Sequence, residues 1–299
     1  MKFWLSLVAV RELEQLPELA RRAEDLGFHG LMVGDHLIWP AHIRTPYPYS
    51  PDGKLFVPPD TPWPDPWVLF AHLAPVTRKL QFASNIYLAG LRDPFTVAKS
   101  VASAAVLTGE RVICGVSAGW LKEEFDAVGV DFASRGARLD ETLSIMRALL
   151  SGESVRHQGP QFSFEGIMRP VPRQPVRIWC GGGAAPAMRR AARQDGWLPL
   201  PMTLKQADTA LGAIRLMRRE AGLPLEGFEV ALPLAEPVTA AAADALEELG
   251  VHDLVVIAPW LPSPWDVTSW LDAGDDMGQL PVKLKALERY AAAVLRKVN

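Results

Sequence analysis

The sequence contains only two cysteines in 299 residues, Cys114 and Cys180. Each lies inside an apolar run that is typical of a buried strand, and neither has a partner at the spacing of a metal site. We therefore expect both to be reduced core residues. We predict no metal ion.

Strong charge is also missing. The formal net charge is -3 at pH 7, and the lysines and arginines are scattered, with no basic run. This distribution gives no electrostatic reason to expect nucleic acid or an anionic membrane as a partner. A small-molecule substrate is the partner we expect.

Long apolar runs are absent as well, because no stretch approaches the roughly 20 residues that span a bilayer. The segment Met1–Val10 imitates the start of a signal peptide, but Arg11 and Glu12 follow where a small-residue cleavage site should lie. We interpret this segment as a first strand. The prediction is a soluble, cytoplasmic protein.

The motifs of the common hydrolases do not occur. There is no Gly-x-Ser-x-Gly elbow, no His-Glu-x-x-His pair and no Walker loop. Acyl transfer and metal-dependent hydrolysis are therefore disfavoured.

What the sequence does have is a regular alternation of extended and helical patterns. After the first strand, Leu13, Leu16, Ala20 and Ala23 recur at helical spacing, and Gly27 is placed to end that helix. Eight such units predict a parallel sheet that closes into a (β/α)₈ TIM barrel, one domain over residues 1–299. The strands are expected in the ranges Met1–Val10, Leu31–Val33, Leu80–Leu88, Arg111–Ser117, Val176–Cys180, Trp197–Leu200, Phe228–Leu234 and Leu254–Ile257.

A doubly wound open sheet is the alternative architecture. It would usually place a glycine-rich turn directly after the first strand, and Arg11–Leu13 is not one. Two segments interrupt the alternation. The proline-rich stretch Pro40–Pro66 follows the second strand and is interpreted as a long lid loop over the barrel mouth, and Ser154–Ile167 is interpreted as a small hairpin inserted before the fifth strand.

Candidate site residues lie where the strands end, because those ends face the active site of a barrel. His36 follows the second strand, and its imidazole can give or take a proton while the adjacent Asp35 could fix its tautomer. The alternative interpretation makes Asp35 a turn cap and His36 a half-buried side chain without a chemical role. Trp39 and Trp63 are candidates for lining an aromatic substrate cavity, although tryptophans are more often packing residues.

Three further strand ends carry small or polar residues. Ser84 and Asn85 end the third strand, and the segment Ser117–Ala118–Gly119–Trp120 ends the fourth. Gly181–Gly182–Gly183 leads from the fifth strand into a helix, where free backbone amides could bind a phosphate. Each pattern also has a purely structural interpretation, as a turn or as close packing.

Four groups of segments occur together in one order along the chain. They are Gly34–Leu37, the lid strings Pro46–Gly53 and Pro64–Pro66, Gly115–Phe125 with its continuation to Glu141, and Ile178–Gly183 leading to Asp195–Trp197. Together they resemble the luciferase-like superfamily, and within it the F420-dependent oxidoreductases. The resemblance runs from roughly Phe3 to Leu200.

The resemblance implies roles for individual positions. It implies that His36 lies near the redox carbon of a deazaflavin with Asp35 beside it, and that the Ser84–Asn85 bond is a non-prolyl cis peptide behind the ring. It implies that Ser117–Trp120 and Gly182–Gly183 contact the cofactor. One branch of the family has a catalytic glutamate at the position of Trp120, so oxidation of sugar phosphates is not expected here. A homodimer is expected, because dimers are common among relatives.

The function expected from this resemblance is hydride transfer between F420 and a carbonyl, imine or activated alkene. An FMN-dependent monooxygenase that uses oxygen is the close alternative. A cofactor-poor structural or ligand-carrying relative is an alternative of another class, and a barrel lyase or isomerase is a third.

Overall fold

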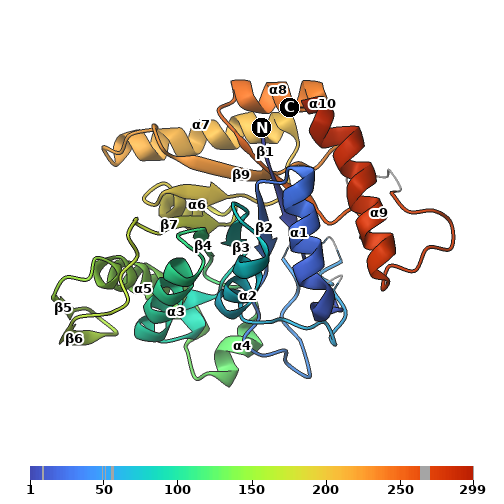
Figure 1. Ribbon diagram of the computed structural model, residues 1–299. Coiled ribbons are helices and arrows are strands. Elements are labelled where there is room, and N and C mark those ends of the chain that lie inside the picture. The colour runs from blue at the N-terminus through green and yellow to red at the C-terminus, as the bar shows by residue number, and fades with distance from the viewer. Residues whose placement is uncertain (9, 49, 51, 55–56, 263–269, 299) are drawn as a thin grey trace.

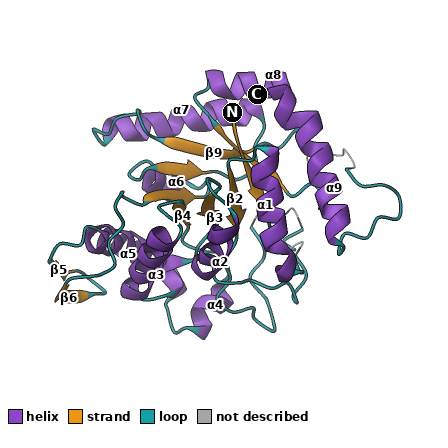
Figure 2. Ribbon diagram, viewed as in Figure 1, coloured by secondary structure: helices purple, strands orange, loops and turns teal. Residues whose placement is uncertain are grey.

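The computed structural model describes residues 1–8, 10–48, 50, 52–54, 57–262 and 270–298. A closed barrel of eight parallel strands forms its centre, and helices surround it (Figures 1 and 2). The strand order around the barrel is β1, β10, β9, β8, β7, β4, β3, β2. This confirms the predicted (β/α)₈ architecture and removes the open sheet as an alternative.

The eight barrel strands are short, as expected for strands that cross a barrel at a tilt. Closure is made by β1 and β10, which pair from Lys2 with Asp253 to Ser6 with Ile257. The strands are β1 (Lys2–Ser6), β2 (Gly30–Val33), β3 (Gln81–Ser84), β4 (Val112–Val116), β7 (Arg177–Gly181), β8 (Gly196–Leu198), β9 (Glu229–Pro233) and β10 (Asp253–Ile257).

One side chain from each barrel strand meets in a buried cluster inside the barrel. Its two largest members are Trp4 and Trp179, whose rings are 5.5 Å apart in an edge-to-face arrangement. The neighbouring strands make room for them with glycine, since a Cβ atom on Gly30 or Gly196 would lie 2.3 Å from an indole. The whole cluster is Trp4, Met32, Ala83, Ile113, Trp179, Leu198, Ala231 and Val255.

The helices form the outer layer. Several begin with a side-chain cap: Asp65, Asp93 and Thr203 each accept a hydrogen bond from a first-turn amide. The main helices are α1 (Leu16–Leu26), α2 (Pro66–Leu73), α3 (Pro94–Leu107), α4 (Lys122–Ala127), α5 (Arg135–Leu150), α6 (Ala185–Ala191), α7 (Leu204–Glu220), α8 (Ala240–Glu248), α9 (Leu280–Tyr290) and α10 (Arg296–Val298).

The two predicted insertions are present. The hairpin pairs β5 (Val155–Gln158) with β6 (Ser163–Gly166), and it lies apart from the barrel beside α3 and α5 (Figure 1). Between β2 and α2, the described residues of the lid loop form neither a helix nor a strand. Tyr49 and Pro51 of the lid string, and Ala9 of the expected first strand, lie outside the described residues.

Some boundaries differ from the sequence-based prediction. The third strand ends at Ser84 and not at Leu88, although Tyr87 still forms an isolated bridge with Val116. The fourth strand ends at Val116 and not at Ser117, and the helix after it begins at Lys122. No helix in the described part of the chain is both long and apolar enough to cross a membrane.

Candidate active site

The four predicted site segments follow β2, β3, β4 and β7, which are consecutive neighbours in the barrel. Their carboxyl ends therefore lie side by side. Backbone hydrogen bonds link the segments directly: Asn85 N donates to Val33 O, and Tyr87 N donates to Gly115 O. The fold thus brings residues that are distant in sequence to one part of the barrel rim.

His36 lies at this rim with most of its side chain buried, 11% of it remaining exposed. Its Nδ1 is 2.9 Å from Oε2 of Glu124, a side chain that is completely buried. The described residues give Nε2 no hydrogen-bond partner. The expectation that Asp35 orients this imidazole is therefore wrong, because the carboxylate that contacts it belongs to Glu124.

Asp35 instead holds the backbone that follows β3. Both of its carboxylate oxygens accept hydrogen bonds from the guanidinium of Arg92, at 2.8 and 2.9 Å, and Oδ2 also accepts from the amide of Leu88. The guanidinium also lies over the ring of Tyr87, 4.3 Å from its centroid. A buried ion pair with two hydrogen bonds fixes the relative positions of the two side chains, so Asp35 supports the wall of the site. It makes no described hydrogen bond with His36.

Three aromatic rings pack together where the two ends of the lid loop meet. His36 makes edge contacts with Trp39 and Trp63, with ring centroids 5.0 and 4.8 Å apart. The two indoles are nearly parallel, with an interplanar angle of 12°. The predicted substrate residues Trp39 and Trp63 therefore do lie against the predicted catalytic histidine.

Trp120 lies under a different part of the lid. Its indole makes an edge contact with the ring of Tyr47, 5.0 Å between centroids. Because Tyr47 belongs to the loop after β2 and Trp120 to the loop after β4, this contact joins the lid to the barrel rim. The lid interpretation of this loop rests on such contacts.

The third strand end contains the non-prolyl cis peptide that the resemblance implied, but one bond further along. It joins Asn85 to Ile86, not Ser84 to Asn85. Ser84 is fully buried, and its hydroxyl donates to Gly115 O and accepts from Gly115 N. The Ser84 side chain thus bonds to β4, which leaves Asn85 and Ile86 as the residues at the rim.

The segment Ser117–Trp120 is half-buried and forms the loop between β4 and α4. Gly119 has a left-handed backbone, φ 83°, and a Cβ atom there would lie 2.9 Å from the ring of Phe125. Glycine is therefore required at this position for structural reasons. The side chain of the neighbouring Ala118 packs against the core. Within this segment, Ser117 and Trp120 are therefore the residues whose side chains could contact a ligand.

The three glycines after β7 have three different environments. A Cβ atom on Gly181 would overlap Ile86 at 1.9 Å, so this residue is needed for packing at the cis peptide. Gly182 has φ 107°, a backbone conformation that favours glycine. Gly183 is exposed, and a Cβ atom there would make only an ordinary contact, 3.9 Å from the side chain of Leu200, so of the three glycines this one is least constrained by packing.

Glu124 is the residue that sequence reasoning missed. It lies 88 positions from His36, and no spacing rule connects the two. It does lie inside the segment Gly115–Phe125 that carries the family resemblance, where the adjacent pair Glu123–Glu124 was the available signal.

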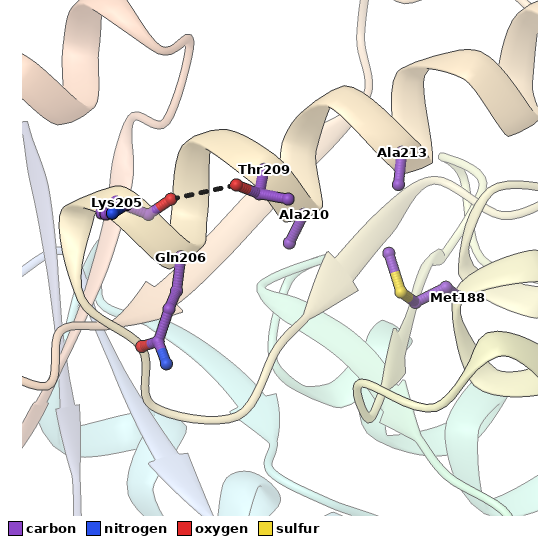
Figure 3. A pocket seen from close by; sticks show the side chains of 6 residues that line it. All are labelled: Met188, Lys205, Gln206, Thr209, Ala210 and Ala213. Carbon is purple, nitrogen blue, oxygen red and sulfur yellow. Dashed lines mark hydrogen bonds between the residues drawn. The ribbon is translucent and has the colours of Figure 1, made fainter.

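A groove of about 400 Å³ lies elsewhere, between α6 and α7 (Figure 3). It contains none of the predicted site residues, and its wall is mainly apolar. The residues that line it are Met188, Lys205, Gln206, Thr209, Ala210 and Ala213. Within the described ranges, no group of three or more His, Cys, Asp or Glu side chains could hold a metal ion.

The residues at the rim fit a planar cofactor with an anionic tail. Nε1 of Trp63 is buried, yet no described residue accepts its hydrogen bond, and a buried donor of this kind normally has a partner. The exposed backbone at Gly183, which has no side chain, would allow a phosphate to approach. Aromatic side chains and an imidazole provide the rest of the lining.

Comparison with known proteins places this geometry in a family. The profile of the family "luciferase-like monooxygenase" matches residues 2–293. The uncharacterized protein Rv0940c of Mycobacterium tuberculosis is 33% identical over 281 residues, 94% of each chain. A phthiodiolone/phenolphthiodiolone dimycocerosates ketoreductase of Mycobacterium bovis is 29% identical over 210 residues, 66% of this chain and 54% of that protein.

Two solved structures share the whole fold. The monooxygenase RslO1 of Streptomyces bottropensis aligns with a TM-score of 0.74 at 17% identity and covers 99% of each chain. The coenzyme F420-dependent tetrahydromethanopterin reductase of Methanopyrus kandleri aligns with a TM-score of 0.72 at 16% identity, over 100% of this chain and 99% of that one. Such low identities show the fold alone, whereas the profile match spans nearly the full sequence. The chain belongs to the luciferase-like monooxygenase family.

Proposed function

We propose that this protein is an F420-dependent oxidoreductase that transfers a hydride between the deazaflavin and a carbonyl, imine or activated alkene. The observation that carries the proposal is His36 at the rim, with Nδ1 bonded to Glu124 and with Trp39 and Trp63 against its ring. Nε2 of this imidazole has no hydrogen-bond partner among the described residues, so it can serve as an acid or a base toward a substrate.

Asn85, Ile86 and Trp120 are the residues that would lie against the ring system of the cofactor. Ser117, Gly182 and Gly183 would lie along its chain and phosphate, where a backbone without side chains permits close approach. When bound, the deazaflavin supplies a hydride donor or acceptor, which no amino-acid side chain can provide.

The chain's own residues manage the substrate and the proton. Trp39 and Trp63 would bind an apolar or planar substrate, and Tyr47 of the lid together with Trp120 of the loop after β4 would exclude water. For an alcohol and ketone pair, oxidation releases the O–H proton to Nε2 of His36 as the C–H hydride leaves, and reduction returns that proton to the ketone oxygen. Glu124 carries no proton in this scheme.

The relatives' names support a carbonyl substrate and F420, since one is called a ketoreductase and one is called an F420-dependent reductase. The second candidate is an FMN-dependent monooxygenase, and the similarity to the monooxygenase RslO1 favours it. The homodimer and the cytoplasmic location expected from the sequence stay predictions.

Cofactor binding tests the proposal. The full chain is titrated with F420 and, separately, with FMN, and cofactor fluorescence is followed. We expect F420 to bind more tightly. Binding of FMN without F420 would replace the proposal by the monooxygenase, and binding of neither would favour the cofactor-poor alternative.

A matched pair of glycine variants locates the binding site. Gly183 is exposed, and a Cβ atom there would make only an ordinary contact with Leu200 at 3.9 Å, so the fold should tolerate Gly183→Val while cofactor affinity falls by roughly 10-fold or more. Gly212→Val, on the open face of α7, should leave affinity unchanged. If both variants bound the cofactor equally well, the phosphate of the cofactor would not bind at Gly183.

A further inference from the structure

Two consecutive carboxylates, Glu123 and Glu124, lie in the first turn of α4 and contact opposite ends of the same loop, residues 37–45. Oε1 of Glu124 accepts hydrogen bonds from the amides of Leu37 at 2.9 Å and Ile38 at 3.4 Å. Oε1 of Glu123 accepts from the amides of Arg44 at 2.7 Å and Thr45 at 3.0 Å. The first stretch of the lid is thus held at both ends by one turn of helix.

The two carboxylates differ in what else they contact. Glu124 is completely buried, and its second oxygen, Oε2, is 2.9 Å from Nδ1 of His36. Glu123 has no hydrogen bond with His36 among the described contacts. A buried carboxylate must be compensated by donors, and Glu124 has two backbone amides and one imidazole nitrogen for this purpose.

This contact restricts the protonation of the imidazole. An ionised carboxylate can only accept hydrogen bonds, so Nδ1 of His36 must be the donor. In the neutral ring the single proton then resides on Nδ1, and the lone pair resides on Nε2. The nitrogen that is left for the substrate is therefore a base when the ring is neutral and an acid when it is doubly protonated.

We propose that Glu124 is a positioning residue that selects the Nδ1–H tautomer of His36 and thereby presents Nε2 to the substrate. The same carboxylate joins this imidazole to residues 37 and 38, so ordering of the lid and orientation of His36 depend on one side chain. The role of Nε2 in turnover rests on the proposed function, whereas the tautomer is a property of the protein itself.

The backbone makes Glu124→Gln a sharp test. The amides of Leu37 and Ile38 are donors, so they hold the oxygen of a glutamine and leave its NH₂ group facing His36. That group donates to Nδ1, which must then carry the lone pair. The variant should convert neutral His36 from the Nδ1–H tautomer to the Nε2–H tautomer without changing the size of the side chain.

Long-range proton–nitrogen correlation spectra of the full chain with ¹⁵N-labelled histidine rings distinguish the two tautomers. The sequence has six histidines, and the spectrum of His36→Asn identifies the signals of His36 by their loss. Spectra are recorded without cofactor over a pH range that includes the neutral ring. We expect Nδ1–H in the wild type and Nε2–H in Glu124→Gln.

Glu123→Gln is the matched control, because it removes the same charge one residue away and should keep Nδ1–H. An Nε2–H tautomer in the wild type, or Nδ1–H retained in a folded Glu124→Gln, would overturn the inference. If Glu124→Gln does not fold, the wild-type spectrum still decides. Because no cofactor is present, the spectra test the tautomer independently of whether F420 or FMN binds. If the protein turned over F420 while neutral His36 carried its proton on Nε2, the inference would be refuted and the proposed function would stand.

Discussion

Tryptophan and histidine side chains differ in their hydrogen bonding at the two ends of the barrel. At the amino ends of the strands, the indole N–H of Trp4 donates to Asp253 at 2.8 Å and that of Trp179 donates to Glu229 at 2.9 Å. At the carboxyl ends, the indole N–H of Trp63 is buried without a described acceptor. At the amino ends, which form the floor of the barrel, both indole donors have acceptors within the protein. At the carboxyl ends, which form the rim, one buried indole donor has no described acceptor.

The histidines repeat this contrast. The side chain of His29 at the floor packs edge-on against Trp4 and makes no hydrogen bond with the described residues, and its pKa is lowered to about 4 by burial and then by the nearby charges of Lys2 and Arg177. His36 at the rim has a carboxylate on one nitrogen and none on the other. A polar group that is satisfied or held neutral stabilises the fold, and one that is half satisfied is available to a ligand.

The largest effect is expected inside the rim itself, at Asp35. Asp35→Asn removes the charge partner of the mostly buried Arg92, and breaking a buried pair in this way costs about 3 kcal/mol of unfolding free energy. Asp60→Asn, which breaks a surface pair with Arg11, should cost less than about 1 kcal/mol. Urea unfolding of both variants measures the difference, and equal losses would mean that Asp35 does not support the site wall.

His36→Ala should have the opposite signature. If the imidazole transfers the proton, turnover falls by about 10²-fold or more while the free energy of unfolding changes little. His72→Ala, on the exposed face of α2, serves as the control and should keep full turnover. Steady-state kinetics with F420 and a series of ketones or alcohols measures the turnover. An unchanged rate would mean that His36 is a half-buried side chain without a chemical role.

The fold could be predicted because its signal is local and repeated. Eight alternations of strand and helix, and a loop and a hairpin that break the pattern, can be recognised from residue types alone. The contact of His36 with Trp63 was partly accessible in the same way, because His36 precedes the lid loop and Trp63 lies near its end. His36 was a candidate because its imidazole follows the second strand, and Trp63 because its ring could line an aromatic cavity; the resemblance added only the place of His36 beside a deazaflavin.

The partners of the charged residues could not be predicted, because barrel closure decides them. His36 has Asp35 next to it in sequence, but the two side chains of adjacent residues diverge, and the rim of β4 brings Glu124 to the imidazole. Asp35 turns to Arg92, which follows β3. The position of the cis peptide, at Asn85–Ile86, likewise could only be approximated by similarity.

A smaller effect is expected at the floor, from His29. Its folded pKa of about 4 lies below the ordinary 6.5, so the unfolded chain binds more protons between these values. Stability should therefore be constant above pH 6.5 and should fall as the pH drops toward 4. Unfolding at several pH values should show a shallower loss for His29→Gln than for the wild type, while His252→Gln, exposed at the same end, should follow the wild type.

The smallest effect is expected at Glu123, and it tests whether the rim holds the lid by charge. Burial opposes ionisation of this carboxyl group, but hydrogen bonds from the Thr45 side chain and from the amides of Arg44 and Thr45 outweigh it and lower the pKa to about 2. The group is therefore fully ionised near neutral pH, and Glu123→Gln replaces charged hydrogen bonds by neutral ones. A loss of about 1 kcal/mol corresponds to roughly 5-fold faster hydrogen exchange of the Arg44 and Thr45 amides. The amides of Leu37 and Ile38, which Glu124 holds, should exchange as in the wild type; if all four accelerate together, the two carboxylates act as one unit and the rim closes cooperatively.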